Sequence, residues 1–392
     1  MAKPRMHLAF DISYTHLDGR WRMPGSWTGR TDPDLDIYEE IARIAERGRL
    51  DMLFFGDGTG IPATWEDSMD EAVRWGISWP RLDKSAYIAC MSRVTKHVGF
   101  GLTYASTFMH PFYVARLLNS LDHVTGGRLA FNVITSTRRS DAANYGFDEL
   151  MEHDRRYDRM EEFVDVCKEL WDGWADDAVT ADAAGGLFVD PAKVRKIDHK
   201  GQFFSVKGAL DLPRSPQGWP VLVQAGGSPA GLEFAAMVGE VIFAAQGKRD
   251  EATKFRNAVR ERMPKYGRDP ELLRILPGLM PIIGATEAEA LEKEKMLNEL
   301  LHPAVGIWML SQQMDFRLYD YPEDGPLPTA DIRATGAAFT PRVVSLMERA
   351  DREGLTVHQC GVLVAASRSH GSVVGTPEQI ADHMQSWLDE GA

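Results

Sequence analysis

The 392-residue sequence has few cysteines, no long apolar run and no excess of positive charge. Its three cysteines, Cys90, Cys167 and Cys360, lie far apart, so they predict neither a metal site nor a disulfide framework. No apolar stretch reaches the roughly 18 residues of a membrane-spanning helix, and the first residues lack a signal-peptide pattern. The net charge of −13 is spread along the chain, which argues against nucleic acid or a membrane as a partner. We therefore expect a cytoplasmic globular protein.

Patterns typical of several enzyme classes are also missing. There is no H-E-x-x-H zinc motif and no G-x-S-x-G nucleophile elbow, and we expect no metal site. The neighbouring carboxylates at 161–162 and 176–177 are typical of solvated helix and loop charges rather than of a glycosidase pair. If the chain is an enzyme, a cofactor is expected to carry the demanding chemistry.

Short apolar runs alternate with amphipathic helical stretches along the chain. Seven of these runs are predicted strands: 6–12, 52–55, 98–104, 129–135, 221–225, 241–245 and 275–283. Strands that alternate with helices pair in parallel through right-handed crossovers. The order therefore predicts an α/β fold, and seven strands suit either a TIM barrel that is one strand short or a doubly wound sheet.

Four stretches interrupt this alternation, at about 13–33, 58–84, 174–218 and 302–372. Without repeats or flexible linkers, they are interpreted as insertions in a single domain over 1–392. A two-stranded excursion is expected at 199–208, whereas 302–372 has few regular cues. The first two insertions follow strands, on what would be the catalytic face of a barrel, and their tryptophans indicate either an apolar pocket or simple packing of the loops. These tryptophans are Trp21, Trp27, Trp65, Trp75 and Trp79.

Polar residues occur at the carboxyl ends of four predicted strands. His16 follows the first strand, Asp57 the second, Thr103 lies near the end of the third, and Asn132 lies within the fourth. A buried amide such as that of Asn132 must find a partner. Convergence at one end is what the rule for barrel active sites predicts.

A second candidate site begins where a predicted strand runs into VLVQAGGSPAG at 221–231. Gly227, Ser228 and Pro229 would start a helix whose free amides suit an anion, although an ordinary serine-capped turn looks the same. In the segment HDRRY, His153 and Tyr157 share one helix face, which suits a phosphate or ring edge but also a plain solvent-exposed face.

Taken together, these segments resemble the bacterial luciferase-like flavin monooxygenases. The similarity follows the whole chain from Met6 to Ala392 and is greatest in the branch that holds nitrilotriacetate and EDTA monooxygenases, dibenzothiophene-sulfone monooxygenase, a pristinamycin synthase and long-chain alkane monooxygenase. The motifs, in order, are SLDHVTGGRLAFNVITS, DAANYGF, EHDRRY, LPRSPQGWPVLVQAGGSPAG, DGPLP and VVGTPEQIAD.

The resemblance implies a TIM barrel that uses reduced FMN (FMNH2), supplied by a separate NAD(P)H:flavin reductase, to activate O2 as a C4a-(hydro)peroxyflavin. One oxygen atom then enters a small organic substrate, which the tryptophans suggest is apolar or aromatic. By the resemblance, the flavin-ring contacts are Asp57, Thr103 and Asn132, and the phosphate contacts are His153, Tyr157, Gly227 and Ser228.

Some expectations stay open at this point. His16 is the candidate catalytic residue near the oxygen-carrying flavin, with a structural hydrogen bond as an equal alternative. Family members have a serine at Gly227 and continue with one more strand and helix, so we expect these last elements to be missing here. We also expect a homo-oligomer, a dimer or a tetramer. The alternative functions are an F420-dependent oxidoreductase on the same barrel or a non-catalytic flavin-binding protein.

Overall fold

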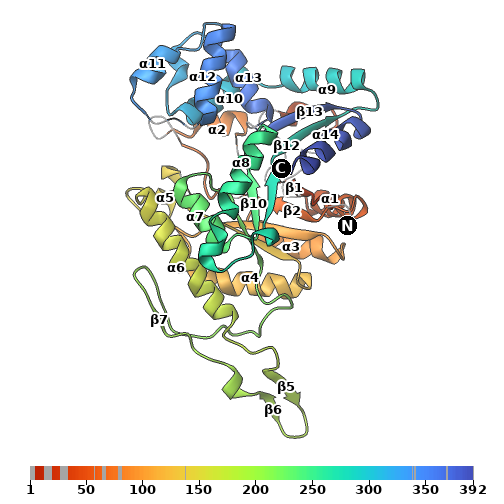
Figure 1. Cartoon of the computed structure of the whole chain (residues 1–392), viewed down its shortest axis with the longest axis vertical. Helices are drawn as coiled ribbons and strands as arrows, with labels where there is room; N and C mark the ends of the chain where they lie inside the picture. The colour runs from red at the N-terminus through yellow and green to blue at the C-terminus, as the bar shows by residue number, and fades with distance from the viewer. Residues whose placement is uncertain are drawn as a thin grey trace.

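The computed structural model in Figure 1 describes most of the chain. The described residues are 5–12, 20–26, 34–56, 58–63, 68–77, 82–136, 138–337, 339, 341–367 and 370–391. Among them, no helix is long and apolar enough to cross a membrane.

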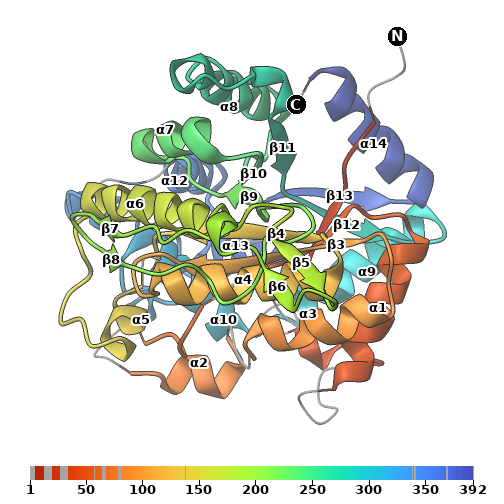
Figure 2. The ribbon, with the colours of Figure 1, turned by 90° about the horizontal axis from the view of Figure 1, so that it is seen from below.

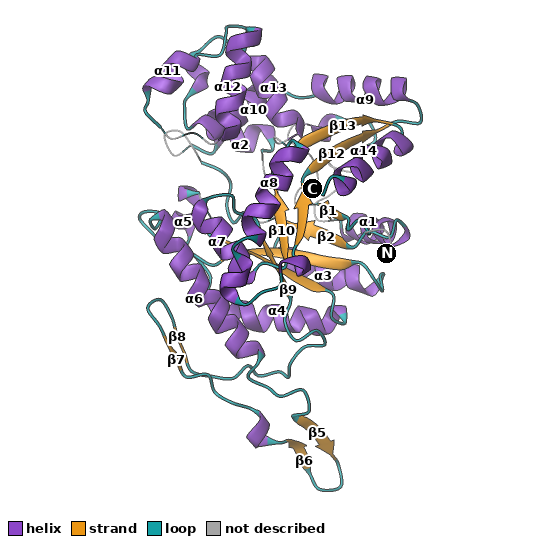
Figure 3. Cartoon of the chain, in the orientation of Figure 1, coloured by secondary structure: helices purple, strands orange, loops and turns teal. Residues whose placement is uncertain are grey.

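A seven-stranded parallel sheet forms a nearly closed barrel, with β1 and β11 as its edge strands (Figure 3). In spatial order the strands are β1 (Ala9–Asp11), β2 (Met52–Phe55), β3 (Gly99–Ala105), β4 (Leu129–Ile134), β9 (Val221–Gln224), β10 (Val241–Ala244) and β11 (Arg274–Pro277). Each falls within a run that the sequence predicts to be a strand, apart from the final residue of β3 and the first residue of β11. The predicted barrel class is confirmed.

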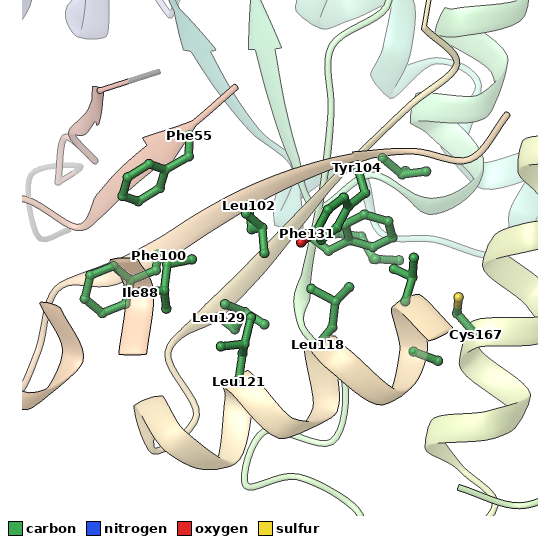
Figure 4. Close-up of a cluster of buried hydrophobic side chains, with 14 of the residues drawn as sticks. Phe55, Ile88, Phe100, Leu102, Tyr104, Leu118, Leu121, Leu129, Phe131 and Cys167 are labelled. Carbon is green, nitrogen blue, oxygen red and sulfur yellow. The ribbon is translucent and has the colours of Figure 1, made fainter. Parts of the chain in front are cut away.

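Helices surround the strands, as the view in Figure 2 shows. The main ones are α1 (Leu35–Arg47), α3 (Lys84–Arg93), α4 (Pro111–Thr125), α6 (His153–Trp171), α7 (Pro229–Val238) and α8 (Arg249–Arg260). They cover the outward faces of the strands, and Figure 4 shows Leu118 and Leu121 of α4 packed toward Leu129 and Phe131 of β4. This packing fixes the strand ends, which carry the candidate site.

The inner faces of the strands can be read from their pairing. Phe54, Ala130 and Val223 form a small apolar cluster inside the barrel. Phe54 pairs with Gly101, and Gly101 pairs with Ala130. Because side chains alternate along a strand, the residues two positions further along, Thr103 and Asn132, also face the interior. The sheet therefore aims these two polar side chains inward, one layer nearer the carboxyl ends of the strands.

The insertion at 174–218 carries two antiparallel hairpins. They are β5 (Val179–Asp182) with β6 (Leu187–Val189), and β7 (His199–Lys200) with β8 (Ser205–Val206). The second hairpin confirms the predicted excursion. In Figure 1 the first hairpin extends away from the barrel. The shorter helices α2 (Asp70–Trp75) and α5 (Arg139–Asn144) lie in the chain segments after β2 and β4.

The segment after β11 is more regular than the sequence suggests. A break at Gly278 separates β11 from β12 (Leu279–Ile283), which pairs in parallel with β13 (Gly371–Gly375), a strand that the sequence analysis did not predict. The residues between them are largely helical and pack around an apolar core of their own. The remaining helices are α9 (Glu287–Glu299), α10 (Pro303–Met314), α11 (Thr329–Ala334), α12 (Pro341–Glu353), α13 (Val357–Ser367) and α14 (Pro377–Asp389).

Candidate functional site

Six of the eight predicted site residues are described by the structure. His16 and Asp57 lie outside the described residues, as do Trp27, Trp65 and Trp79. The six described residues are Thr103, Asn132, His153, Tyr157, Gly227 and Ser228.

Thr103 and Asn132 form a hydrogen-bonded pair on neighbouring strands. The Thr103 hydroxyl donates to the Phe55 carbonyl at 2.7 Å and accepts from Asn132 Nδ2 at 3.0 Å. Because the hydroxyl proton already goes to Phe55, the amide nitrogen of Asn132, not its oxygen, must face Thr103. Asn132 Oδ1 is buried and has no hydrogen-bond partner among the described residues. An unpaired buried acceptor of this kind suits an N–H group of a bound ligand.

Ser228 begins α7 as its N-cap. Its Oγ accepts from the Gly231 amide at 3.1 Å, and Pro229 occupies the first turn, where the missing amide proton costs nothing. The amides of this turn carry the positive end of the helix dipole, and the Ser228 hydroxyl keeps its own proton to donate. The start of α7 is therefore chemically suited to an anion such as a phosphate.

Tyr157 of α6 lies directly against this loop. A Cβ atom added to Gly226 or Gly231 would come within 2.8 or 2.9 Å of the Tyr157 hydroxyl, so only glycine allows this close approach. The His153 ring lies 5.2 Å from the Tyr157 ring, centroid to centroid. The serine-capped turn and the His/Tyr face thus come together as the two sides of one cradle.

The residues of this cradle and the Asn132–Thr103 pair fit a flavin mononucleotide. The ring of that cofactor carries N–H groups that could meet Asn132 Oδ1, and its phosphate matches the donors around Ser228 and Tyr157. No group of three or more metal-binding side chains occurs in the described part of the chain. Flavin binding by the individual residues stays a prediction.

Sequence reasoning missed two arginines near the end of β4, one on α6 and one in the segment that follows the strand. Arg156 is buried on α6 and donates Nη1 to the carbonyl of Ser136, whose φ of 44° is unusual for a non-glycine residue. A sequence signal existed, because Arg156 precedes Met160 and Phe163 at helical spacing on the buried stripe of α6. Arg138, which follows β4, carries a buried Nη1 atom without a partner among the described residues.

The two described tryptophans of the first insertions have different environments. Trp21 is exposed, whereas Trp75 stacks on His302 with ring centroids 3.7 Å apart and donates to Glu71 at 2.6 Å. Trp75 and Ile61 belong to an apolar cluster with residues of α2, α10 and α13, which we call the α2–α10 cluster. At Trp75, therefore, the packing interpretation holds. Burial raises the pKa of Tyr319 in the same cluster.

A family model described as luciferase-like monooxygenase matches residues 21–392. The chain is 39% identical over 378 residues to N-acetyl-S-(2-succino)cysteine monooxygenase of Bacillus subtilis (strain 168), a match that covers 96% of this chain and 83% of that protein. It is 38% identical over 399 residues to nitrilotriacetate monooxygenase component A of Aminobacter aminovorans, covering 100% of this chain and 87% of that one.

Solved structures agree with these sequence matches. DmoA of Hyphomicrobium sulfonivorans superposes with a TM-score of 0.89 at 32% identity, covering 99% of this chain and 82% of that chain. A riboflavin lyase solved with modified FMN and riboflavin gives a TM-score of 0.85 at 28% identity, covering 99% and 85%. The predicted resemblance and its branch are confirmed.

Proposed function

Since this chain belongs to the luciferase-like monooxygenase family, we propose that it is the oxygenating component of a two-component system that uses reduced FMN and O2. The chain is a flavin-dependent oxidoreductase. When bound, reduced FMN would activate O2 so that one oxygen atom enters an organic substrate and the other leaves as water.

The single observation that carries the proposal of a flavin-type ring in the barrel is the unpaired Asn132 Oδ1. Thr103 prevents this amide from rotating to satisfy itself, so the oxygen is available to a ring N–H and would orient the flavin in the barrel. Asp57 would contact the ring from the loop after β2, as the resemblance implies.

At the other end of the cofactor, the α7 start would hold the phosphate. Ser228 would donate its hydroxyl proton, the Gly227 amide would add a second donor, and Tyr157 would contribute its hydroxyl from α6. His153 would lie beside Tyr157, with Nδ1 engaged by Asp154 at 2.7 Å and Nε2 left for the phosphate. Anchoring at both ends would keep the ring in one position.

The partners follow from the same proposal. The relative named nitrilotriacetate monooxygenase component A carries a component letter, which supports a separate protein that supplies the reduced flavin. We take this protein to be an NAD(P)H:flavin reductase, and the oxygenase to be a homo-oligomer. The substrate is taken to be a small molecule with an apolar or aromatic body, as the tryptophans of the first two insertions suggest. His16 would exchange a proton or a hydrogen bond near the reacting oxygen.

The test is oxygen transfer under isotopically labelled O2. The purified chain is incubated with FMN, an NADH-dependent flavin reductase and a panel of sulfides, sulfones, alkanes and amines, and products are analysed by mass spectrometry. The proposal expects a product carrying one ¹⁸O atom only when both proteins and FMN are present. If the chain instead converts a substrate with reduced F420 in place of FMN, and the product carries no ¹⁸O, the chain is a hydride-transfer enzyme and the proposal is contradicted.

A further inference from the structure

Buried polar atoms without partners gather at the carboxyl ends of β4 and β9. Asn132 Oδ1, Arg138 Nη1, Arg156 Nε and Gln224 Oε1 are all inaccessible to solvent, and none has a hydrogen-bond partner among the described residues. Folded proteins pair the large majority of such atoms, and an unpaired cationic donor is the most costly exception. A cluster of them is therefore expected where a ligand supplies the missing partners.

Arg138 is the member of this cluster with the most unused capacity. Arg156 already donates Nη1 to the Ser136 carbonyl, whereas the guanidinium of Arg138 makes neither a hydrogen bond nor an ion pair with any described residue. It lies between the end of β4 and the first turn of α5, where the chain holds it partly out of water. A guanidinium offers five donors and a full positive charge, so its natural partner is an anion.

The sheet order separates Arg138 from the phosphate cradle. The helix α5 packs against the segments that follow β2 and β3. A Cβ on Gly60, after β2, would come 2.6 Å from Asn144, and the ring of Tyr145 stacks on that of Phe108, after β3, with centroids 5.0 Å apart. The cradle lies on the opposite side of β4, after β9 and on α6. Asn132, the proposed ring contact, lies on β4 between the two. An anion at Arg138 therefore belongs to the ring end of the site, where the substrate reacts.

We propose that Arg138 binds a carboxylate of the substrate. This inference rests on the proposed function, because it takes the ring at Asn132 as its reference. A planar guanidinium forms two parallel hydrogen bonds with a carboxylate, which fixes the orientation of the molecule that carries it. The substrate class is therefore an organic acid that combines the apolar body of the proposed function with one carboxylate held at Arg138.

The test compares acids with their uncharged esters on defined variants. The probes are phenylacetate and 4-(methylthio)butanoate, each paired with its methyl ester, and binding is measured by calorimetry on protein with and without oxidised FMN. We expect the wild type to bind at least one acid about tenfold or more tightly than its ester. Arg138→Ala should remove this preference, and Arg138→Lys should retain part of it. Arg139→Ala is the matched control, because Arg139 is the exposed neighbour with the same charge.

Two results of this experiment would overturn the inference directly. These are a wild type that prefers none of the acids to their esters, and Arg138→Ala protein that keeps the preference. If Arg138→Ala weakens the binding of FMN and of the acid together, the guanidinium binds the flavin phosphate rather than the substrate. If the wild type fails to bind FMN, the proposed function is contradicted. The role of Arg138 is then still decided by comparing how the flavin-free wild type and the flavin-free Arg138→Ala variant bind the acids. Arg138→Lys keeps the charge, so a folding defect confined to the alanine variant is recognised.

Discussion

Asn132 and Thr103 lie opposite each other on β4 and β3, and the Asn132 amide donates to the Thr103 hydroxyl at 3.0 Å. The same hydroxyl donates to the Phe55 carbonyl at the end of β2. Three neighbouring strands thus fix the direction of one side chain and leave its Oδ1 acceptor unpaired inside the barrel. A site positioned by strands is held more rigidly than one positioned by loops.

Replacing Asn132 by alanine should weaken the binding of reduced FMN. Loss of one buried hydrogen bond to the ring corresponds to about 1–2 kcal/mol, or roughly a 5–30-fold rise in Kd. Fluorescence titration under anaerobic conditions measures this change. Asn119→Ala is the control, because Asn119 is equally buried but donates to the Pro213 carbonyl from α4. That variant should lose stability and keep its FMN affinity, and equal losses of affinity in both variants would contradict the assignment.

Gly231→Ala should disturb the phosphate cradle. The new Cβ would lie 2.9 Å from the Tyr157 hydroxyl and 3.0 Å from the Gly226 carbonyl carbon, so the hydroxyl or the loop must move. We expect at least a tenfold loss of FMN affinity, about 1.4 kcal/mol, in an equilibrium titration. Gly208→Ala, where a Cβ would meet no atom within 4 Å, should bind FMN as the wild type does. Unchanged affinity in the Gly231 variant would show that the cradle is not used.

Two substitutions at Ser228 separate helix capping from phosphate binding. Ser228→Ala removes the cap to the Gly231 amide and should cost about 0.5–2 kcal/mol of stability, whereas Ser228→Gly should cost only a few tenths. Both variants lack the hydroxyl and should lose FMN affinity to a similar extent. Thermal unfolding without flavin measures the first effect, and titration measures the second. A glycine variant that binds FMN normally would restrict Ser228 to a capping role.

Glu162 should make the docking of the β7–β8 hairpin dependent on pH. Burial alone would raise its pKa, but hydrogen bonds from the Phe203 and Phe204 amides, at 2.9 and 2.8 Å, and from His199 outweigh burial and hold the pKa below 4.5. The ionised carboxylate therefore stabilises the fold above the unfolded-state pKa, and this contribution disappears as pH falls through the lower folded-state pKa. Glu162→Gln should cost about 1–3 kcal/mol at pH 7.

The difference in melting temperature between wild type and Glu162→Gln should therefore shrink as the pH is lowered from 7 to below 4.5. Glu161→Gln is the matched control with the opposite sign. Burial and the nearby Asp158 raise the pKa of Glu161, so its charge is unfavourable in the folded state. That variant should be as stable as the wild type or more stable at neutral pH. A constant difference between wild type and Glu162→Gln across the pH range would exclude a role for ionised Glu162.

Strands and the start of α7 could be predicted because their signals are local. Alternation of apolar runs identifies β1 to β4, and the order Gly227, Ser228, Pro229 identifies a capped helix. The helices α10 and α13 gave no such signal. They are packed between neighbours and are apolar on most sides, so the amphipathic period that identifies surface helices is absent.

The candidate site could be predicted only as a set of residue types. Position at strand ends predicts that Thr103 and Asn132 lie near each other, but their hydrogen bond depends on strand register. The unpaired guanidinium of Arg138 depends on how α5 packs over neighbouring loops. Nothing in the sequence at 138–139 distinguishes the partly buried Arg138 from the exposed Arg139. Tertiary packing decides such positions.

The most direct test of the account is an anaerobic titration of the wild type with reduced FMN and, separately, with reduced riboflavin, which lacks the phosphate. Asn132 and the α7 cradle together predict saturable binding of reduced FMN, at least tenfold tighter than that of reduced riboflavin because the phosphate gains charge-assisted hydrogen bonds. No binding of reduced FMN, or equal affinity for the two flavins, would contradict the account.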